Sequence, residues 1–289
     1  MLEIGASRPP SGLLDTLALV VTWSVASLVT LFFGWLLVDL VAGGVSQLSW
    51  SFLIESPRNA RGDGGIGSVL VSTAWILAIC LGVVIVLGTG AAVWLAEYAA
   101  RTGTRARWVR RSLDVLAGVP SIVFGLFGSV LFGAWLGLGF SILAGGLTLA
   151  CMVLPIYIRA AEAGLRAVPD DQRRAAAALG LSRTTTLWRV LLPGASAGLA
   201  VGLVLGVGRA AAETAALLYT AGYVDRMPTS WLDSGRSLSV HIFDLSMNVY
   251  GGEGNAYAAA LVLVGLLLAI NLVASAISAR FGARSEGAW

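Results

Sequence analysis

Long apolar stretches constrain this chain more than any other feature of its sequence. A helix needs about 20 apolar residues to cross the hydrocarbon core of a bilayer. Six stretches reach roughly that length: 16–41, 67–96, 113–136, 140–158, 194–221 and 256–279. Only 12% of residues are charged, against about 25% in a typical soluble domain. We therefore expect an all-α, multi-pass protein of the plasma membrane with six spanning helices. The first apolar run is longer than that of a signal peptide, which favours an uncleaved helix.

The arginines orient the bundle, because cytoplasmic connections carry an excess of basic residues. With both termini in the cytoplasm, the outer connections hold only Arg58, Arg61, Arg226 and Arg236, and Arg209 alone lies within a span. The cytoplasmic segments then hold Arg8, Arg101, Arg105, Arg107, Arg110, Arg111, Arg159, Arg166, Arg173, Arg174, Arg183, Arg189, Arg280 and Arg284. This asymmetry predicts cytoplasmic N- and C-termini.

The composition also excludes several classes of function. All 19 basic residues are arginine, so the chain has no lysine for a Walker A loop or a pyridoxal Schiff base. The two cysteines, Cys80 and Cys151, stand singly in apolar runs, and His241 is the only histidine. We expect no metal site. The net charge of +3 comes from arginines between apolar runs, which indicates membrane topology and no nucleic-acid partner.

The connection at 159–195 has the signals of two short helices. Pro169 and the two aspartates after it suit the start of a helix, and an alanine-rich run follows. Gly180 is placed to end that helix in the left-handed conformation. Ser182 can cap a second helix, which we expect to run through Leu191 and to stop before Pro193.

The spacing within this connection resembles the EAA motif of bacterial ABC importer permeases, Glu-Ala-Ala-x3-Gly-x9-Ile-x-Leu-Pro. Arg174 stands where the motif has glutamate, and Val190 replaces isoleucine. The resemblance implies that these helices dock a separate ATPase, with the arginine altering the polar contact. The residues assigned to docking are Arg174, Ala175, Ala176, Gly180, Leu181, Leu192 and Pro193.

Other segments are similar to those of phosphate permeases of the PstA type. They are LAEYA at 95–99, LAGVPSIVFGLFG at 116–128, LPIYIRAAEAGLRAVP at 154–169 and RAAAETAALLYTAG at 209–222. The resemblance implies the six-helix fold of type I (MetI-like) importer permeases and half of a channel for inorganic phosphate. It implies a PstC-type second permease, two PstB-type subunits that bind the ATP, a PstS-type binding protein and no cofactor or enzymatic activity in this chain.

This interpretation divides the chain into four parts. Residues 1–15 and 282–289 are cytoplasmic tails, and 16–66 contain the first spanning helix and an outer loop. Residues 67–281 form the importer transmembrane domain, with a coupling loop at 159–193, whose helices span 169–193, and an outer loop at 222–255. That outer loop is as consistent with a re-entrant segment as with a plain solvated connection.

Arg209 and Glu213 are unusual because they lie within the fifth apolar stretch. A charge at such depth costs about 2.5–3.5 kcal/mol or more, so it should face protein or water and be paired. On a continuous helix the two side chains would meet at i, i+4. One interpretation is a structural ion pair. The other is a substrate relay, in which Arg209 contacts phosphate through its planar donors and Glu213 tunes and releases it.

The same stretch carries a glycine at every fourth position, a spacing that lets a neighbouring helix approach closely. These glycines are Gly194, Gly198, Gly202 and Gly206. Pro120 and Pro155 are placed to kink their helices. We interpret Glu97 and Asp114, which lie near span ends, as interfacial anchors.

Two alternatives to a phosphate permease remain open from the sequence. One is a permease of the same superfamily for another oxyanion or a different solute. The other is a secondary transporter or channel that works without ATP, which would have no need of an ATPase-docking loop.

Overall fold

The computed structural model describes residues 12–58, 63–99 and 103–286, and these residues are almost entirely helical. Most of the predicted N-terminal tail, the end of the C-terminal tail, and Arg8, Arg61 and Arg101 lie outside the described residues. The α-helices are α1 (Leu13–Gly44), α2 (Trp50–Ile54), α3 (Gly67–Val83), α4 (Thr89–Val93), α5 (Thr104–Ala117), α6 (Ser121–Gly128), α7 (Ile142–Ala167), α8 (Asp170–Ala178), α9 (Arg183–Thr186), α10 (Leu192–Gly194), α11 (Ser196–Ala211), α12 (Ala215–Leu218), α13 (Leu238–Met247) and α14 (Glu253–Glu286).

Several of these helices are joined end to end by wide π-helical turns, and a short 3-10 turn, η1 (Val45–Gln47), follows α1. The π-helical turns are η2 (Val84–Gly88), η3 (Trp94–Tyr98), η4 (Ser129–Trp135) and η5 (Leu187–Leu191). A single hairpin pairs β1 (Pro57–Arg58) with β2 (Asp63–Gly64) in antiparallel register.

Four of the described helical segments are long and apolar enough to cross a membrane. They are Asp15–Gln47, Gly67–Tyr98, Ile142–Ala167 and Glu253–Ala276. Four of the predicted stretches, 16–41, 67–96, 140–158 and 256–279, are therefore confirmed as long helices.

The other two predicted spans are broken. The stretch 113–136 is divided at Gly118–Pro120, where α5 meets the α6–η4 segment at 102°. Pro120 has no amide proton to continue a helix, so the kink expected at that proline is a full change of direction. The stretch 194–221 is also divided, because the segment Arg183–Gly194 meets α11 at 65° and α11 ends at Ala211. If each bent pair forms one span, the count rises from four to six.

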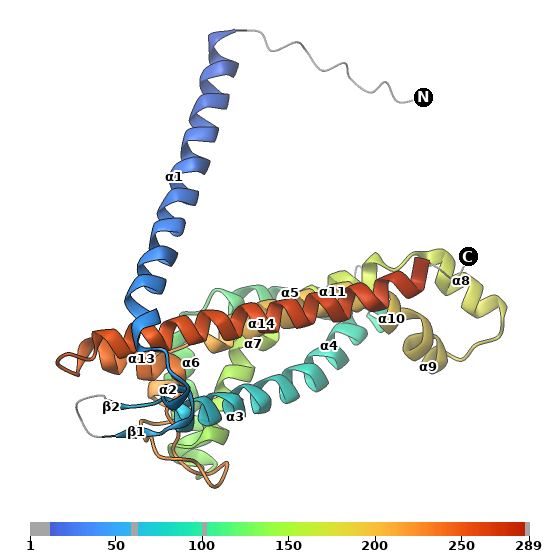
Figure 1. Ribbon diagram of the computed structural model, residues 1–289. Coiled ribbons are helices and arrows are strands. Elements are labelled where there is room, and N and C mark those ends of the chain that lie inside the picture. Colours follow the sequence, from blue (N-terminus) through green and yellow to red (C-terminus); the bar gives the residue numbers. More distant parts are fainter. Residues whose placement is uncertain (1–11, 59–62, 100–102, 287–289) are drawn as a thin grey trace.

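The core of the molecule is built around α7, the most buried of the long helices. Helices α3, α5, α6 and α11 all pack against it, as Figure 1 shows. Pro155 lies inside α7 without ending it. These four helices therefore share α7 as their common buried packing partner.

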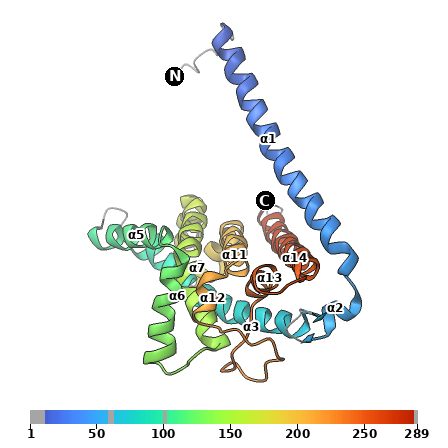
Figure 2. The same ribbon diagram turned by 90° about the vertical axis from the view of Figure 1, so that its left-hand side faces the viewer.

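Helix α1 lies apart from this body. Figures 1 and 2 show it leaning away from the other helices, and it meets them at its C-terminal end. There Gly43 and Gly44 pack on Tyr257 of α14, whose hydroxyl donates to Asp39 at 3.1 Å. The rest of α1 presents exposed apolar side chains along nearly its whole length, as expected for a helix that lipid or another subunit covers.

The connection at 222–255, predicted to be an outer loop, is a folded structure in the described chain. It includes helix α13, whose side chains from Leu238 to His241 are buried. The amide of Leu238 donates to Thr73 of α3 at 2.8 Å, and Ser237 caps α13 by accepting from Val240. The plain solvated loop is therefore excluded as a description of the whole connection.

Candidate functional site

The connection between α7 and α11 folds as two short helices joined at a glycine. Gly180 adopts φ +71°. Its amide donates to the carbonyl of Ala177 at 3.0 Å, and the amide of Leu181 donates to the carbonyl of Ala176 at 3.1 Å. These two bonds define a Schellman motif. The predicted helix start at Pro169 and the left-handed end at Gly180 are both confirmed.

The second helix of this loop begins as predicted but ends later. The Ser182 hydroxyl accepts a bond from the amide of Thr185 at 3.2 Å and so caps α9. The expected stop before Pro193 is wrong, because the helical path continues through η5 and α10 to Gly194. Pro193 lies directly after the wide turn η5, and the break falls at Ala195 instead.

Most of the residues predicted from the EAA spacing to dock an ATPase are exposed on this loop. Arg174, at 78% side-chain exposure, pairs with Asp171 at 2.7 Å within the same helix. Ala176 is buried and Leu192 is half-buried, while Ala175, Leu181 and Pro193 are exposed. Leu179 and Trp188 are also strongly exposed, so the loop presents apolar side chains together with a cation.

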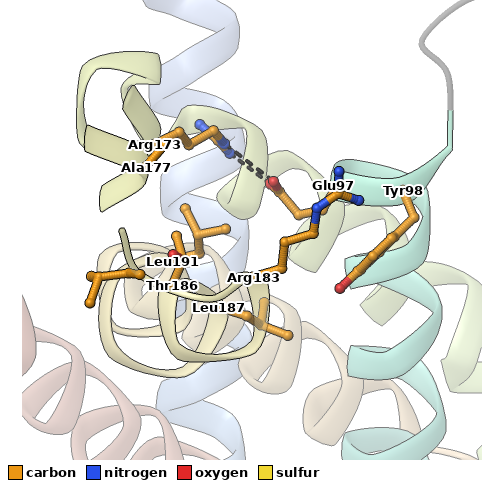
Figure 3. Close-up of a pocket in the computed structure, with 9 residues that line it drawn as sticks. Glu97, Tyr98, Arg173, Ala177, Arg183, Thr186, Leu187 and Leu191 are labelled. Atoms are coloured by element: carbon orange, nitrogen blue, oxygen red, sulfur yellow. Dashed lines mark hydrogen bonds and ion pairs between the residues drawn. The ribbon is translucent and has the colours of Figure 1, made fainter. Parts of the chain in front are cut away.

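On its inner side the loop is hydrogen-bonded to the end of the second long helix, Gly67–Tyr98. Arg173 of α8 donates to Glu97 of η3 from Nη2 at 2.8 Å and from Nε at 3.3 Å, as Figure 3 shows. This pairing raises the pKa of the Arg173 guanidinium above its usual value. Beside the pair lies a cavity of about 250 Å³, also lined by Tyr98, Arg183 and Thr186. The two-helix loop thus contacts the end of the helix Gly67–Tyr98 through a polar junction.

A second cluster surrounds Glu162 of α7, which is almost fully buried. Arg110, Arg159 and Arg166 donate to its carboxylate at 2.7, 3.2 and 3.0 Å. Sequence reasoning missed this cluster and treated Glu97 and Asp114 as interfacial anchors, whereas Asp114 pairs with Arg159 at 3.1 Å. A signal was present in the spacing of Arg159, Glu162 and Arg166, which places all three on one helix face.

The expected ion pair between Arg209 and Glu213 is absent. Helix α11 ends between them, so the i, i+4 geometry is lost. Glu213, only 6% exposed, instead accepts a bond from the amide of Ala216 at 3.2 Å and so caps α12. The backbone carbonyl of Glu213 accepts from Ser239 of α13 at 2.6 Å. Within the described chain Arg209 has no acidic partner, and its side chain is exposed.

The four glycines of the fifth stretch lie against α7 and the residue that follows it. A Cβ on Gly194 would meet Val168 at 3.3 Å, and one on Gly198 would meet the Cα of Gly164 at 2.4 Å. Further along, Gly202 lies against Tyr157 and Ala160, and Gly206 against Val153. Backbone-to-backbone contact at Gly198 is what a small-residue stripe makes possible.

A different face of α11 is left uncovered. Ala197, Val201, Leu205 and Arg209 recur at every fourth position, and all four are exposed. A third face lines an apolar groove of about 390 Å³ shared with α3 and α14. Arg209 therefore lies at the end of an exposed apolar stripe, on neither the α7 face nor the face toward α14.

Residues 85–286 match the family described as the inner membrane component of binding-protein-dependent transport systems. The chain belongs to this family. The match begins in η2 and includes the coupling loop, the arginine clusters and α11. This permease is therefore a multi-pass membrane protein, and members of its family work with separate ATPase subunits.

Curated relatives resemble this permease over most of its length. A probable ABC transporter permease protein, YqgI of Bacillus subtilis, is 34% identical over 81% of this chain and 85% of its own. Phosphate transport system permease protein PstA 1 of Mycobacterium tuberculosis is 33% identical over 84% and 81%. The PstA protein of Xylella fastidiosa is 32% identical over 83% and 84%.

Solved structures support the fold. A chain of the MetNI methionine ABC transporter in an inward-facing form aligns with a TM-score of 0.56 at 19% identity, over 74% of this permease and 95% of that chain. A bacterial ABC transporter for import of the acidic polysaccharide alginate aligns with a TM-score of 0.52 at 15% identity, over 89% and 96%. The MetI-like fold of an importer permease is thus shown.

The connection at 222–255 contains a buried charge network that the sequence did not predict. Arg236 donates to Asp244 at 3.0 Å and lies over the ring of Tyr223, 4.3 Å from its centroid. Burial and the Arg236 charge lower the pKa of His241 to about 4. Burial would raise the pKa of Asp244, but hydrogen bonds from Tyr223 and Asn248 and the Arg236 charge hold it below its usual range. His241 is thus neutral at pH 7 and fixed beside an ion pair.

Proposed function

We propose that this permease is the transmembrane subunit of an ATP-driven importer of inorganic phosphate. The observation that carries the proposal is the glycine-linked pair of coupling helices, with Arg174, Leu179 and Trp188 exposed on its outer surface. Such a surface fits a groove on a separate ATPase, because exposed apolar side chains with a polar rim are typical of protein interfaces. The assignment of phosphate as the substrate rests on the relatives named as phosphate transport permeases.

In this proposal the chain supplies half of the pathway. A related PstC-type permease supplies the other half, two PstB-type subunits hydrolyse ATP, and a PstS-type protein delivers phosphate from outside. The bent pairs Thr104–Ala117 with Ser121–Trp135 and Arg183–Gly194 with Ser196–Ala211 each count as one span, which gives six spans and two cytoplasmic termini. The excess of arginine in the connections assigned to the cytoplasm supports this orientation.

Arg209 is the residue proposed to contact phosphate in the pathway. Its guanidinium stays charged and offers a planar set of donors that match phosphate oxygens. It lies on the exposed stripe of α11, where a second subunit or the pathway would face it. Glu213, behind the helix break, supplies a fixed negative charge that weakens anion binding, and conduction needs a site that also releases.

The test is uptake of radiolabelled phosphate by the whole complex reconstituted in vesicles with ATP. We expect uptake that unlabelled phosphate suppresses and sulfate does not. Arg209→Ala should abolish uptake while the complex still assembles, and Leu205→Ala, one turn earlier on the same exposed stripe, should leave it unchanged. Equal uptake by Arg209→Ala and wild type would remove Arg209 from the pathway. A complex that retains no stoichiometric ATPase would instead indicate a secondary transporter.

A further inference from the structure

Arg173 joins three elements through one guanidinium. Besides the two bonds to Glu97, its Nη2 donates to the carbonyl of Leu165 at 2.8 Å, and its Nη1 donates to the carbonyl of Val168 and to Asp170. Leu165 lies in the last turn of α7, Arg173 in α8 and Glu97 in η3. The same side chain therefore binds the first coupling helix to the cytoplasmic ends of two long helices.

We infer that the Arg173–Glu97 pair transmits movement of the coupling helix α8 to the second long helix, α3–η3. Both are positioning residues that couple ATP hydrolysis to opening of the pathway. The inference rests on the proposed function, since it takes the ATPase to move α8.

The geometry of the pair suits transmission of force. Its partners are 76 positions apart in sequence, so it links separate elements, and two parallel bonds to one carboxylate resist rotation as well as separation. The side chains are only 23% and 18% exposed, which limits screening by salt. The neighbouring pair, Arg174 with Asp171, is exposed and lies within α8. That second pair lies within one helix, so it links α8 to no other element of this chain.

The end of the second long helix is also held from the side. The carbonyl of Leu95 accepts bonds from Arg110 of α5 and Arg166 of α7, each at 3.1 Å, and both arginines share Glu162. These contacts hold the backbone of η3 at Leu95 against α5 and α7. Among the described ion pairs that reach η3, Arg173 provides the only one from the coupling loop.

The surroundings leave room for the end of η3 beyond Leu95, which carries Glu97, to move. The cavity of about 250 Å³ lies beside the pair, and in Figure 3 Arg183 of α9 extends toward Glu97 and Tyr98. The last turn of the second helix is a π turn, an irregularity that is frequent at functional sites. A displacement of α8 can therefore shift Glu97 without breaking a regular helix.

The inference is tested by charge reversal in the complete complex. Arg173→Glu and Glu97→Arg are made singly and together, with Arg58→Glu and Glu55→Arg as the control, an exposed ion pair beside β1 and outside the coupling loop. Retention of the ATPase, ATP hydrolysis and phosphate uptake are measured in the same vesicles. We expect each single reversal at 173 or 97 to keep the ATPase bound and hydrolysing. Uptake per ATP should fall on the order of tenfold, a size typical of coupling between sites.

The double reversal should restore uptake per ATP while the rate of ATP hydrolysis stays constant. If the pair had a merely structural role, the ratio of uptake to hydrolysis would not recover in this way. If a reversed variant does not assemble, Glu97→Gln, which keeps the shape of the side chain, should show the same loss to a smaller degree. Unchanged uptake per ATP in both single reversals, or in Glu97→Gln, would overturn the inference. So would a double reversal that assembles without recovery. If the wild-type complex shows no ATP-driven phosphate uptake, the proposed function fails instead.

Discussion

The contact between α7 and α11 gives a quantitative prediction, because at Gly198 the two backbones touch. A Cβ at this position would lie 2.4 Å from the Cα of Gly164 and 3.0 Å from its nitrogen. Carbon atoms in good contact lie about 3.5–4.0 Å apart, so the helices must separate by about 1 Å. No side chain can rotate to relieve the clash. Overpacking of this kind costs about 1–3 kcal/mol, and we expect Gly198→Ala to lower the free energy of unfolding by that amount.

Two other glycines on α11 complete the series. At Gly206 the added Cβ would meet a side-chain atom, Cγ1 of Val153, at 2.7 Å, and at Gly208 it would meet nothing within 4 Å. We expect an intermediate loss for Gly206→Ala. Gly208→Ala should be neutral or gain up to about 1 kcal/mol, because alanine favours the helix. The assay is reversible unfolding of the purified permease by SDS in mixed micelles, followed by tryptophan fluorescence. Equal stabilities for the 198 and 208 variants would refute the reasoning.

Three further predictions concern other parts of the molecule. Gly180→Val should weaken retention of the ATPase in a pull-down, because φ +71° costs a branched residue about 1–2 kcal/mol, while Gly180→Asn, which tolerates this conformation, should retain it. Glu213→Ala should lower stability by only about 1 kcal/mol in the same SDS assay, the usual loss for a helix cap; a loss of 3 kcal/mol or more would indicate a buried ion pair instead. Because the pKa of His241 is depressed to about 4 in the folded protein, the unfolded chain binds a proton at His241 more readily than the folded protein does. Its contribution to stability, about 3 kcal/mol, is present above pH 6.5 and lost as pH falls toward 4. Hydrogen exchange of residues 222–252, corrected for intrinsic rates, should rise over that window in wild type and not in His241→Phe.

The coupling loop could be predicted from sequence because its determinants are local. A proline and two aspartates start α8, Gly180 ends it, and Ser182 starts the next helix, all through bonds that span six residues or fewer. Capping and left-handed glycine act over this range whatever the rest of the fold does. The same locality explains why four of the six long apolar stretches were located correctly.

The breaks in the fifth stretch were not predictable in the same way. Apolar residues flank both Ala195 and the segment 212–214 directly, so the apolar pattern marks neither break. The end of α11 depends on Ser239 and the buried Glu213 carboxylate, which bind to the broken backbone. The Arg173–Glu97 pair depends likewise on a contact between distant segments. Such contacts exist only once the chain has folded.

The end of α11 at Ala211 separates the two charges of the fifth stretch. Sequence alone allowed Arg209 and Glu213 to neutralise one another, which would have left a self-contained pair with no need of an external ion. In the structure the carboxylate is occupied in capping α12, and the guanidinium is exposed on an apolar stripe without an acidic partner among the described residues. An unpaired charge at membrane depth is costly, so we expect its neutralising group to lie outside the described residues. A mobile oxyanion neutralises Arg209 only while it passes. We therefore expect the Arg209 charge to have its lowest energy in the membrane when an oxyanion is bound in the pathway.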